Sequence, residues 1–95
     1  TDFETVRIRM SDSLWYVYIV RASDETLYTG ITTDLKRRLA EHQSGKAGAK
    51  YFRGRTALEM VFTESSATRS AASKREAEIK KLTRAQKVSL IKSGN

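Results

Sequence analysis

The chain has 95 residues and carries 18 Lys and Arg against 11 Asp and Glu, which gives a formal net charge of +7. It lacks cysteine and has one histidine, so disulfides, Cys-type zinc centres and His-cluster sites are excluded, and any metal must take oxygen ligands. The length fits one small domain with a thin core, and no run approaches the roughly 18 apolar residues of a membrane span or has the pattern of a leader peptide. We therefore expect a soluble, cytoplasmic protein, with a monomer as the favoured state.

The charge is unevenly distributed along the chain. Residues 1–34 hold six acids and three bases, residues 36–55 hold seven bases and one acid, and residues 69–92 hold eight bases and two acids. A basic surface built by the later two thirds favours a polyanionic partner, either nucleic acid or an anionic membrane surface. A solvated helix face has the same composition, so charge alone leaves both interpretations open.

The N-terminal half begins with a predicted leader and a predicted hairpin. Residues 1–13 show no sustained period and predict a flexible leader, in which Met10 is an alternative start, leaving 14–93 as one domain. The aromatic and β-branched run at 14–20 predicts a central strand, and residues 26–31 predict a second. The five residues between them favour an antiparallel hairpin.

A helix is predicted from Asp34, a good N-cap residue, to about Ser44. A long basic loop at 45–55 follows it, and residues 58–62 predict a third strand. This strand is expected to end in a helix-start cluster at 64–66.

Two helices are predicted in the last third of the chain. The first starts near Ala67, and the second starts where Thr83 and Gln86 match a capping box and ends at Gly94. The order β-β-α-β-α-α predicts an α+β domain, with a small three-stranded antiparallel sheet flanked by helices.

Two tyrosine triplets, Tyr16-Val17-Tyr18 and Tyr28-Thr29-Gly30, lie on the predicted hairpin. Such a hairpin can bring the Tyr18 and Tyr28 hydroxyls to one face, where two phenols can orient a water and a phosphate oxygen. Strand tyrosines also pack without further function. Gly30 favours either a bulge or a close approach by another group.

Arg38 and His42 are four residues apart and share a helical face. Arg38 can bind phosphate bidentately, although an ion pair with Asp34 or Glu41 is the alternative. His42 can contact phosphate or transfer a proton near neutral pH, or it can be a structural histidine.

Glu76 is the candidate metal ligand. A helical projection turns it towards the apolar side, whereas Glu78 points roughly the opposite way. One carboxylate with waters and phosphate oxygens suits Mg²⁺, and an ion pair of Glu76 with Lys80 is the alternative.

Together these residues resemble the GIY-YIG nuclease superfamily, and above all its small stand-alone bacterial members. The resemblance extends from Leu14 to Ile91 and includes YVY, YTG, TDLKRRLAEHQSGK, GAKYFRGR and KREAEIKKLTRAQK. It implies a DNA endonuclease that uses one Mg²⁺ or Mn²⁺, is structure-directed or weakly sequence-selective, serves DNA repair or recombination, and has no membrane partner.

The resemblance also implies roles for individual residues. Tyr18 looks like the first-motif tyrosine that activates or orients water, and Tyr28 looks like the second, which holds the phosphate or water. Arg38 looks like the helix arginine that stabilises phosphate charge, with His42 in the same network. Glu76 looks like the single metal ligand. The basic loop and helices favour contacts to DNA phosphates, through Lys46, Lys50, Arg53, Arg55, Lys74, Arg75 and Lys80.

Three positions depart from the family pattern. Tyr16 replaces the first-motif glycine, Thr29 replaces an isoleucine, and Ile31 stands where repair-type relatives carry a lysine. Two alternatives to an enzyme stay open, namely a non-catalytic nucleic-acid-binding module that keeps the nuclease fold and a protein-interaction adaptor with a basic surface.

Overall fold

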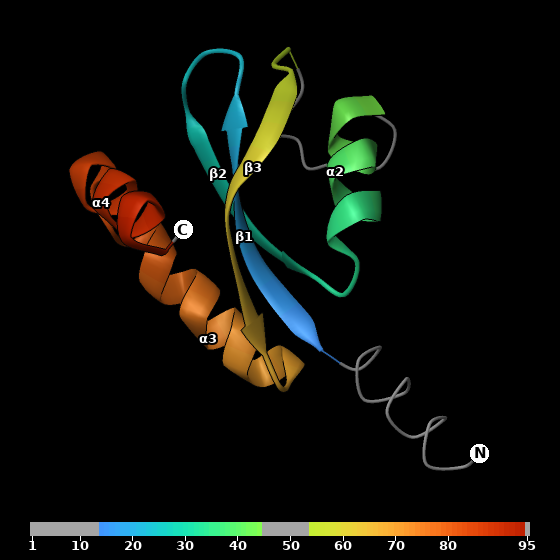
Figure 1. Ribbon diagram of the computed structural model, residues 1–95, viewed down its shortest axis with the longest axis vertical. Coiled ribbons are helices and arrows are strands. Elements are labelled where there is room, and N and C mark those ends of the chain that lie inside the picture. The colour runs from blue at the N-terminus through green and yellow to red at the C-terminus, as the bar shows by residue number, and fades with distance from the viewer. Residues whose placement is uncertain (1–13, 45–53, 95) are drawn as a thin grey trace.

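The computed structural model describes residues 14–44 and 54–94, and the predicted leader and most of the basic loop lie outside them. The predicted order of elements and the α+β class are confirmed (Figure 1). The elements are β1 (Trp15–Ala22), β2 (Leu27–Thr32), α2 (Leu35–Ser44), β3 (Ala57–Ser66), α3 (Arg69–Lys80) and α4 (Arg84–Gly94).

The sheet has the order β2-β1-β3 with antiparallel pairing on both sides of β1, so the predicted central strand is confirmed. In the β1–β2 ladder Tyr18 lies opposite Gly30, and Val20 lies opposite Tyr28. Side chains two residues apart on a strand share a face, and directly opposite residues do so as well. The register therefore places both tyrosines on one face, as the hairpin predicts.

The third strand is longer than the sequence indicates. Residues 64–66 were expected to start a helix, but they continue β3, where Ser66 pairs with Trp15. The strand gains ladder partners from β1 there, which outweighs the weak β-propensity of serine. The helix begins at Arg69 instead, and the Thr68 Oγ1 caps it by accepting the Ala71 N–H at 3.0 Å.

The other two helices begin as their sequences predict. The Arg37 N–H donates to Asp34 Oδ1 at 3.0 Å at the start of α2. At the start of α4, Thr83 and Gln86 exchange two hydrogen bonds, which confirms the capping box. These caps fix the residues at which α2 and α4 begin.

Each face of the sheet packs against a different set of helices. Helices α3 and α4 cover one face and α2 covers the other (Figure 1). Alternate residues of β1 supply the two cores, because strand side chains alternate in direction. The α3 side is built around Val17, Ile19, Phe62, Ala72 and Ile79, and the α2 side around Tyr18, Val20, Ala22 and Ala57.

Candidate active site

Gly30 is placed where a larger residue would collide with Tyr18. A Cβ atom at position 30 would lie 2.5 Å from the Tyr18 hydroxyl oxygen and 2.7 Å from the ring carbon that carries it. The Tyr18 ring therefore lies across the glycine backbone of the neighbouring strand. Of the two explanations offered for this glycine, close approach is the one found, since the β1–β2 register runs through Gly30 without a shift.

Tyr18, Tyr28 and His42 form a compact group of rings between the sheet and α2. The Tyr18 hydroxyl oxygen is 2.9 Å from His42 Nε2, and both residues are almost fully buried. The Tyr28 ring is only partly buried, with its centroid 6.4 Å from that of Tyr18 and 5.4 Å from that of His42. Tyr28 is therefore the member that faces the outside.

The protonation states of this group follow from its burial. Burial raises the pKa of the Tyr18 phenol above 10.0, and a hydrogen bond with Arg38 partly opposes that rise. Burial lowers the pKa of His42 from 6.5 to about 4, and the nearby Arg38 charge acts in the same direction. Near pH 7 both groups are neutral. In the histidine tautomer with its proton on Nδ1, the Tyr18 hydroxyl donates to Nε2.

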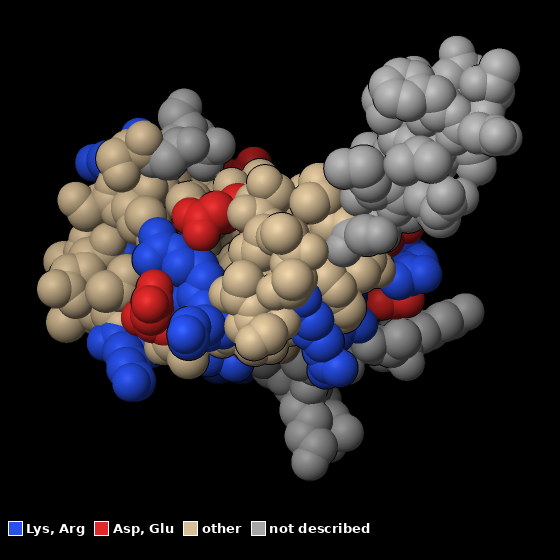
Figure 2. All heavy atoms as spheres, turned by 90° about the horizontal axis from the view of Figure 1, so that it is seen from below, with Lys and Arg blue, Asp and Glu red and all other residues tan. Residues whose placement is uncertain are grey.

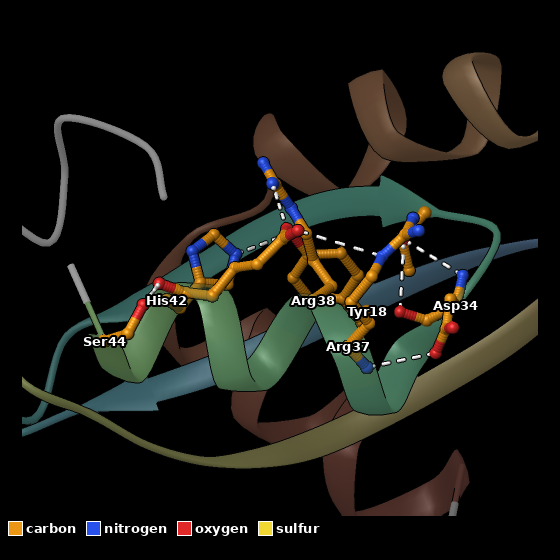
Figure 3. A network of polar contacts seen from close by, with 8 residues as sticks. Tyr18, Asp34, Arg37, Arg38, His42 and Ser44 are labelled. Carbon is orange, nitrogen blue, oxygen red and sulfur yellow. Dashed lines mark hydrogen bonds and ion pairs between the residues drawn. The ribbon is translucent and has the colours of Figure 1, made fainter. Parts of the chain in front are cut away.

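Arg38 connects this group to the surface of α2 (Figure 3). Its guanidinium hydrogen-bonds the Tyr18 hydroxyl, and its Nη1 donates to Glu41 Oε1 at 2.9 Å. The ion pair that was the alternative to a phosphate contact is thus present, with Glu41. A guanidinium has five N–H donors in a fixed fork, which is the geometry that binds phosphate oxygens bidentately.

Glu76 is the half-buried acid that the helical projection indicates. Its side chain is 22% exposed, against 61% for Glu78 on the same helix. Its carboxylate pairs with Lys80 at 3.2 Å, so the predicted alternative partner is present. Burial is the main cause of the raised pKa of Tyr18, and the charge of Glu76, on the helix that covers the opposite face of the sheet from α2, adds a smaller rise.

The donors available to a metal near this group are few. Within residues 14–44 and 54–94, no three His, Asp or Glu side chains are grouped to hold an ion. A lone carboxylate fits a hard cation such as Mg²⁺, which keeps most of its ligands as water and substrate oxygens. By the chemistry of its donor, Glu76 fits such an ion.

The predicted phosphate-binding residues differ in how much of their charge is available. Lys46, Lys50 and Arg53 lie outside the described residues. Arg55 pairs with Asp24 at 2.6 Å, and Arg75 pairs with both Glu64 and Glu78. Figure 2 shows basic side chains over much of one face with acidic side chains among them. Part of the net positive charge is therefore neutralised locally.

The sequence indicated Glu41 only as an ion-pair partner of Arg38, as the alternative to a phosphate contact. It lies 2.9 Å from Arg38 Nη1 and 3.8 Å from Arg37 Nε, so one carboxylate orients two guanidinium groups. The signal in the sequence is its position three residues after Arg38, on the same helix face.

The model of the GIY-YIG catalytic domain matches residues 14–89. The chain belongs to this family. A GIY-YIG domain is a nuclease domain, which indicates an endonuclease that acts on DNA.

Relatives of this GIY-YIG chain occur in archaea and bacteria. A UPF0213 protein of Natronomonas pharaonis is 57% identical over 76 residues, which are 80% of this chain and 88% of the relative. A UPF0213 protein of Yersinia pestis is 51% identical over 82 residues, 86% of this chain and 85% of the relative. The solution NMR structure of a UPF0213 protein from Bacillus halodurans has a TM-score of 0.55 and 41% identity, and the match covers 86% of this chain and 87% of that one. The small GIY-YIG domain is therefore common to all three.

None of the helices in the described part of this GIY-YIG domain is long and apolar enough to cross a membrane.

Proposed function

We propose that this protein is a divalent-metal-dependent DNA endonuclease that hydrolyses phosphodiester bonds, with structure-directed or weakly sequence-selective recognition. The observation that carries the proposal is the Tyr18–His42 hydrogen bond of 2.9 Å, with Arg38 on the same hydroxyl and Glu76 in its electrostatic environment. Buried, mutually bonded groups of this kind are typical of catalytic sites rather than of strand packing.

Tyr18 acts in this proposal as a proton relay. Its raised pKa keeps the phenol neutral, so it does not accept a proton as a free phenolate. Its oxygen can instead take a proton from the attacking water as its own proton passes to His42 Nε2, so that Tyr18 stays neutral. The low pKa of His42 makes it a weak base, so the transferred proton is readily released afterwards.

Arg38 and Tyr28 bind the phosphate in this mechanism. Glu41 holds one nitrogen of Arg38 and thereby fixes the plane of the guanidinium, whose fork of donors suits the non-bridging oxygens of a phosphate. Donors that are fixed before the reaction stabilise developing charge without reorganisation. The partly exposed Tyr28 supplies a further hydroxyl at the open side of the group.

Glu76 is the residue that would hold the divalent ion. When bound there, Mg²⁺ or Mn²⁺ supplies Lewis-acid stabilisation of the oxygens around phosphorus and lowers the pKa of bound water. Lys80 would have to release the Glu76 carboxylate for an ion to bind there, and because Lys80 is about half exposed, its ammonium would remain in water.

The test uses Glu76→Ala with Glu78→Ala as its matched control, since both acids belong to α3 and only Glu76 is half-buried. Branched, flapped and single-stranded DNA is incubated with purified protein and Mg²⁺ or Mn²⁺. Wild type and Glu78→Ala should cut, and Glu76→Ala should lose activity by about 100-fold or more. Equal rates for all three proteins would rule out the proposal.

The ion pair between Glu76 and Lys80 favours a second candidate, a nucleic-acid-binding module without catalysis. Such a module predicts binding to DNA or RNA that weakens steeply with salt and is unchanged by Glu76→Ala. Cleavage that depends on Glu76 would exclude it.

A further inference from the structure

A hollow of about 220 Å³ lies between the start of β2 and helix α4, on the side of the sheet that α4 covers. Its lining residues are Thr26, Leu27, Arg84 and Lys87. Two of these four side chains are cationic, and neither was among the predicted phosphate-binding residues. Pockets for drug-sized molecules usually exceed about 300 Å³, so this space suits a smaller, charged group.

Arg84 and Lys87 differ from several other basic residues of the domain in having no acidic partner among the described residues. Neither forms an ion pair with any residue of 14–44 or 54–94, whereas Arg38, Arg55 and Arg75 each do. Helix α4 also contains no acidic residue. Two like charges therefore line one hollow without neutralisation, an arrangement that favours an anion between them.

The acidic residues that directly precede Thr26 and Leu27 in the sequence interact with other groups. Asp24 accepts hydrogen bonds from the hydroxyl and N–H of Thr26 and pairs with Arg55 at 2.6 Å. Glu25 pairs with Arg21 at 3.2 Å. The Gln86 N–H at the start of α4 already donates to Thr83 Oγ1. The attraction for an anion therefore comes from the side chains of Arg84 and Lys87.

The hollow and the ring group lie on opposite faces of the sheet, at its edge strand β2. Leu27 lines the hollow, and the next residue, Tyr28, belongs to the ring group with Tyr18 and His42. Glu76 lies on α3, whose end leads directly into α4. A nucleic-acid strand that contacts both the ring group and the hollow must cross the edge strand β2.

We propose that this hollow binds an internal backbone phosphate of the nucleic-acid substrate, on the other side of the edge strand β2 from the phosphate at the catalytic group, through Arg84 and Lys87. This inference rests on the proposed function for the identity of the substrate. It assigns to α4 a positioning role for the bound strand, because phosphate contacts fix register without reading sequence.

The test measures binding alone, by fluorescence anisotropy of single-stranded oligonucleotides in EDTA over a series of salt concentrations. Lys87→Gln is compared with Lys92→Gln, because both lysines belong to α4 and only Lys87 lines the hollow. Lys87→Gln should weaken binding about 3-fold and Arg84→Gln/Lys87→Gln about 10-fold at roughly 0.1 M salt, with the salt slope reduced by about 0.7 for each cationic side chain replaced. Lys92→Gln should change affinity less than 2-fold.

Two outcomes would overturn the inference. Equal losses for Lys87→Gln and Lys92→Gln, with melting temperatures unchanged, would mean that only net charge matters. Sensitivity to the double substitution confined to oligonucleotides with a 5′-phosphate would mean that the hollow binds a terminal phosphate. The experiment measures binding and no cleavage. A protein that binds nucleic acid without cutting it would contradict the endonuclease proposal, but the test of the hollow would still be valid.

Discussion

The two sides of strand β1 are equally buried and chemically different. Towards α3 it presents Val17 and Ile19, and towards α2 it presents Tyr18, each no more than 1% exposed. The first side packs aliphatic groups, whereas the second buries a phenol against the His42 imidazole. The α3 side of β1 thus contributes to an aliphatic core, and its α2 side contributes to a polar network. Three predictions test this division.

The largest effect is expected for Tyr18→Phe, compared with Ile19→Val. Loss of the hydroxyl removes the relay to His42 and the Arg38 contact, so cleavage should fall about 100-fold or more. Stability should fall by only about 1 to 2 kcal/mol. Ile19→Val should cost about 1 kcal/mol and leave the cleavage rate unchanged. Rates and urea unfolding of both variants check this, and a large rate loss in Ile19→Val would contradict the division.

The second effect is a loss of stability in acid that originates at His42. Its pKa is about 4 in the folded protein and 6.5 as the ordinary value, so between these pH values the unfolded chain binds more protons. The His42 contribution is present above pH 6.5 and is lost as the pH falls towards 4. At pH 5 the free energy of unfolding should be about 2 kcal/mol lower than at pH 8.

Urea unfolding at pH 8, 6.5 and 5 measures this loss, with His42→Gln as the variant that lacks the titrating group. The variant should show a much flatter dependence over this range. If the free energy of unfolding of His42→Gln fell between pH 8 and pH 5 as much as that of the wild type, the acid sensitivity would originate at carboxylates instead.

The smallest effect is expected on the aliphatic side, at Thr29. Thr29 is 3% exposed, and its Oγ1 has no hydrogen-bond partner within residues 14–44 and 54–94. Thr29→Val keeps the shape and removes an unsatisfied hydroxyl, so stability should rise by about 1 kcal/mol with no change in cleavage.

Thr32→Val is the matched control for Thr29→Val. Thr32 is 5% exposed, but its Oγ1 accepts the Asp34 N–H at 3.1 Å. The control should therefore lose about 1 kcal/mol when the stabilities of both variants are measured by urea unfolding. Destabilisation by Thr29→Val would show that its hydroxyl has a partner in solution.

Local sequence signals predicted most of the fold. The short β1–β2 connection determined the hairpin, and with it the common face of Tyr18 and Tyr28, because the side-chain period of a strand is two. The caps at Asp34 and Thr83 predicted where two helices begin. The length of β3 was missed, since it depends on ladder partners that β1 provides.

The candidate site was predicted only as a set of residue types. Helical projection distinguished Glu76 from Glu78, and their exposures agree with it. The contacts between Arg55 and Asp24 and between Arg75 and Glu64 join residues far apart in the chain. No local pattern encodes such pairs, so the sequence could not indicate which basic residues are neutralised.

The contact between Tyr18 and Gly30 makes the two positions interdependent in any redesign of this domain. A side chain at position 30 requires a smaller residue or a displaced ring at position 18, because the two would occupy the same space. Either adjustment moves the hydroxyl away from His42. A library that varies position 30 alone should return only glycine, whereas a joint library should return stable variants that have lost the phenol.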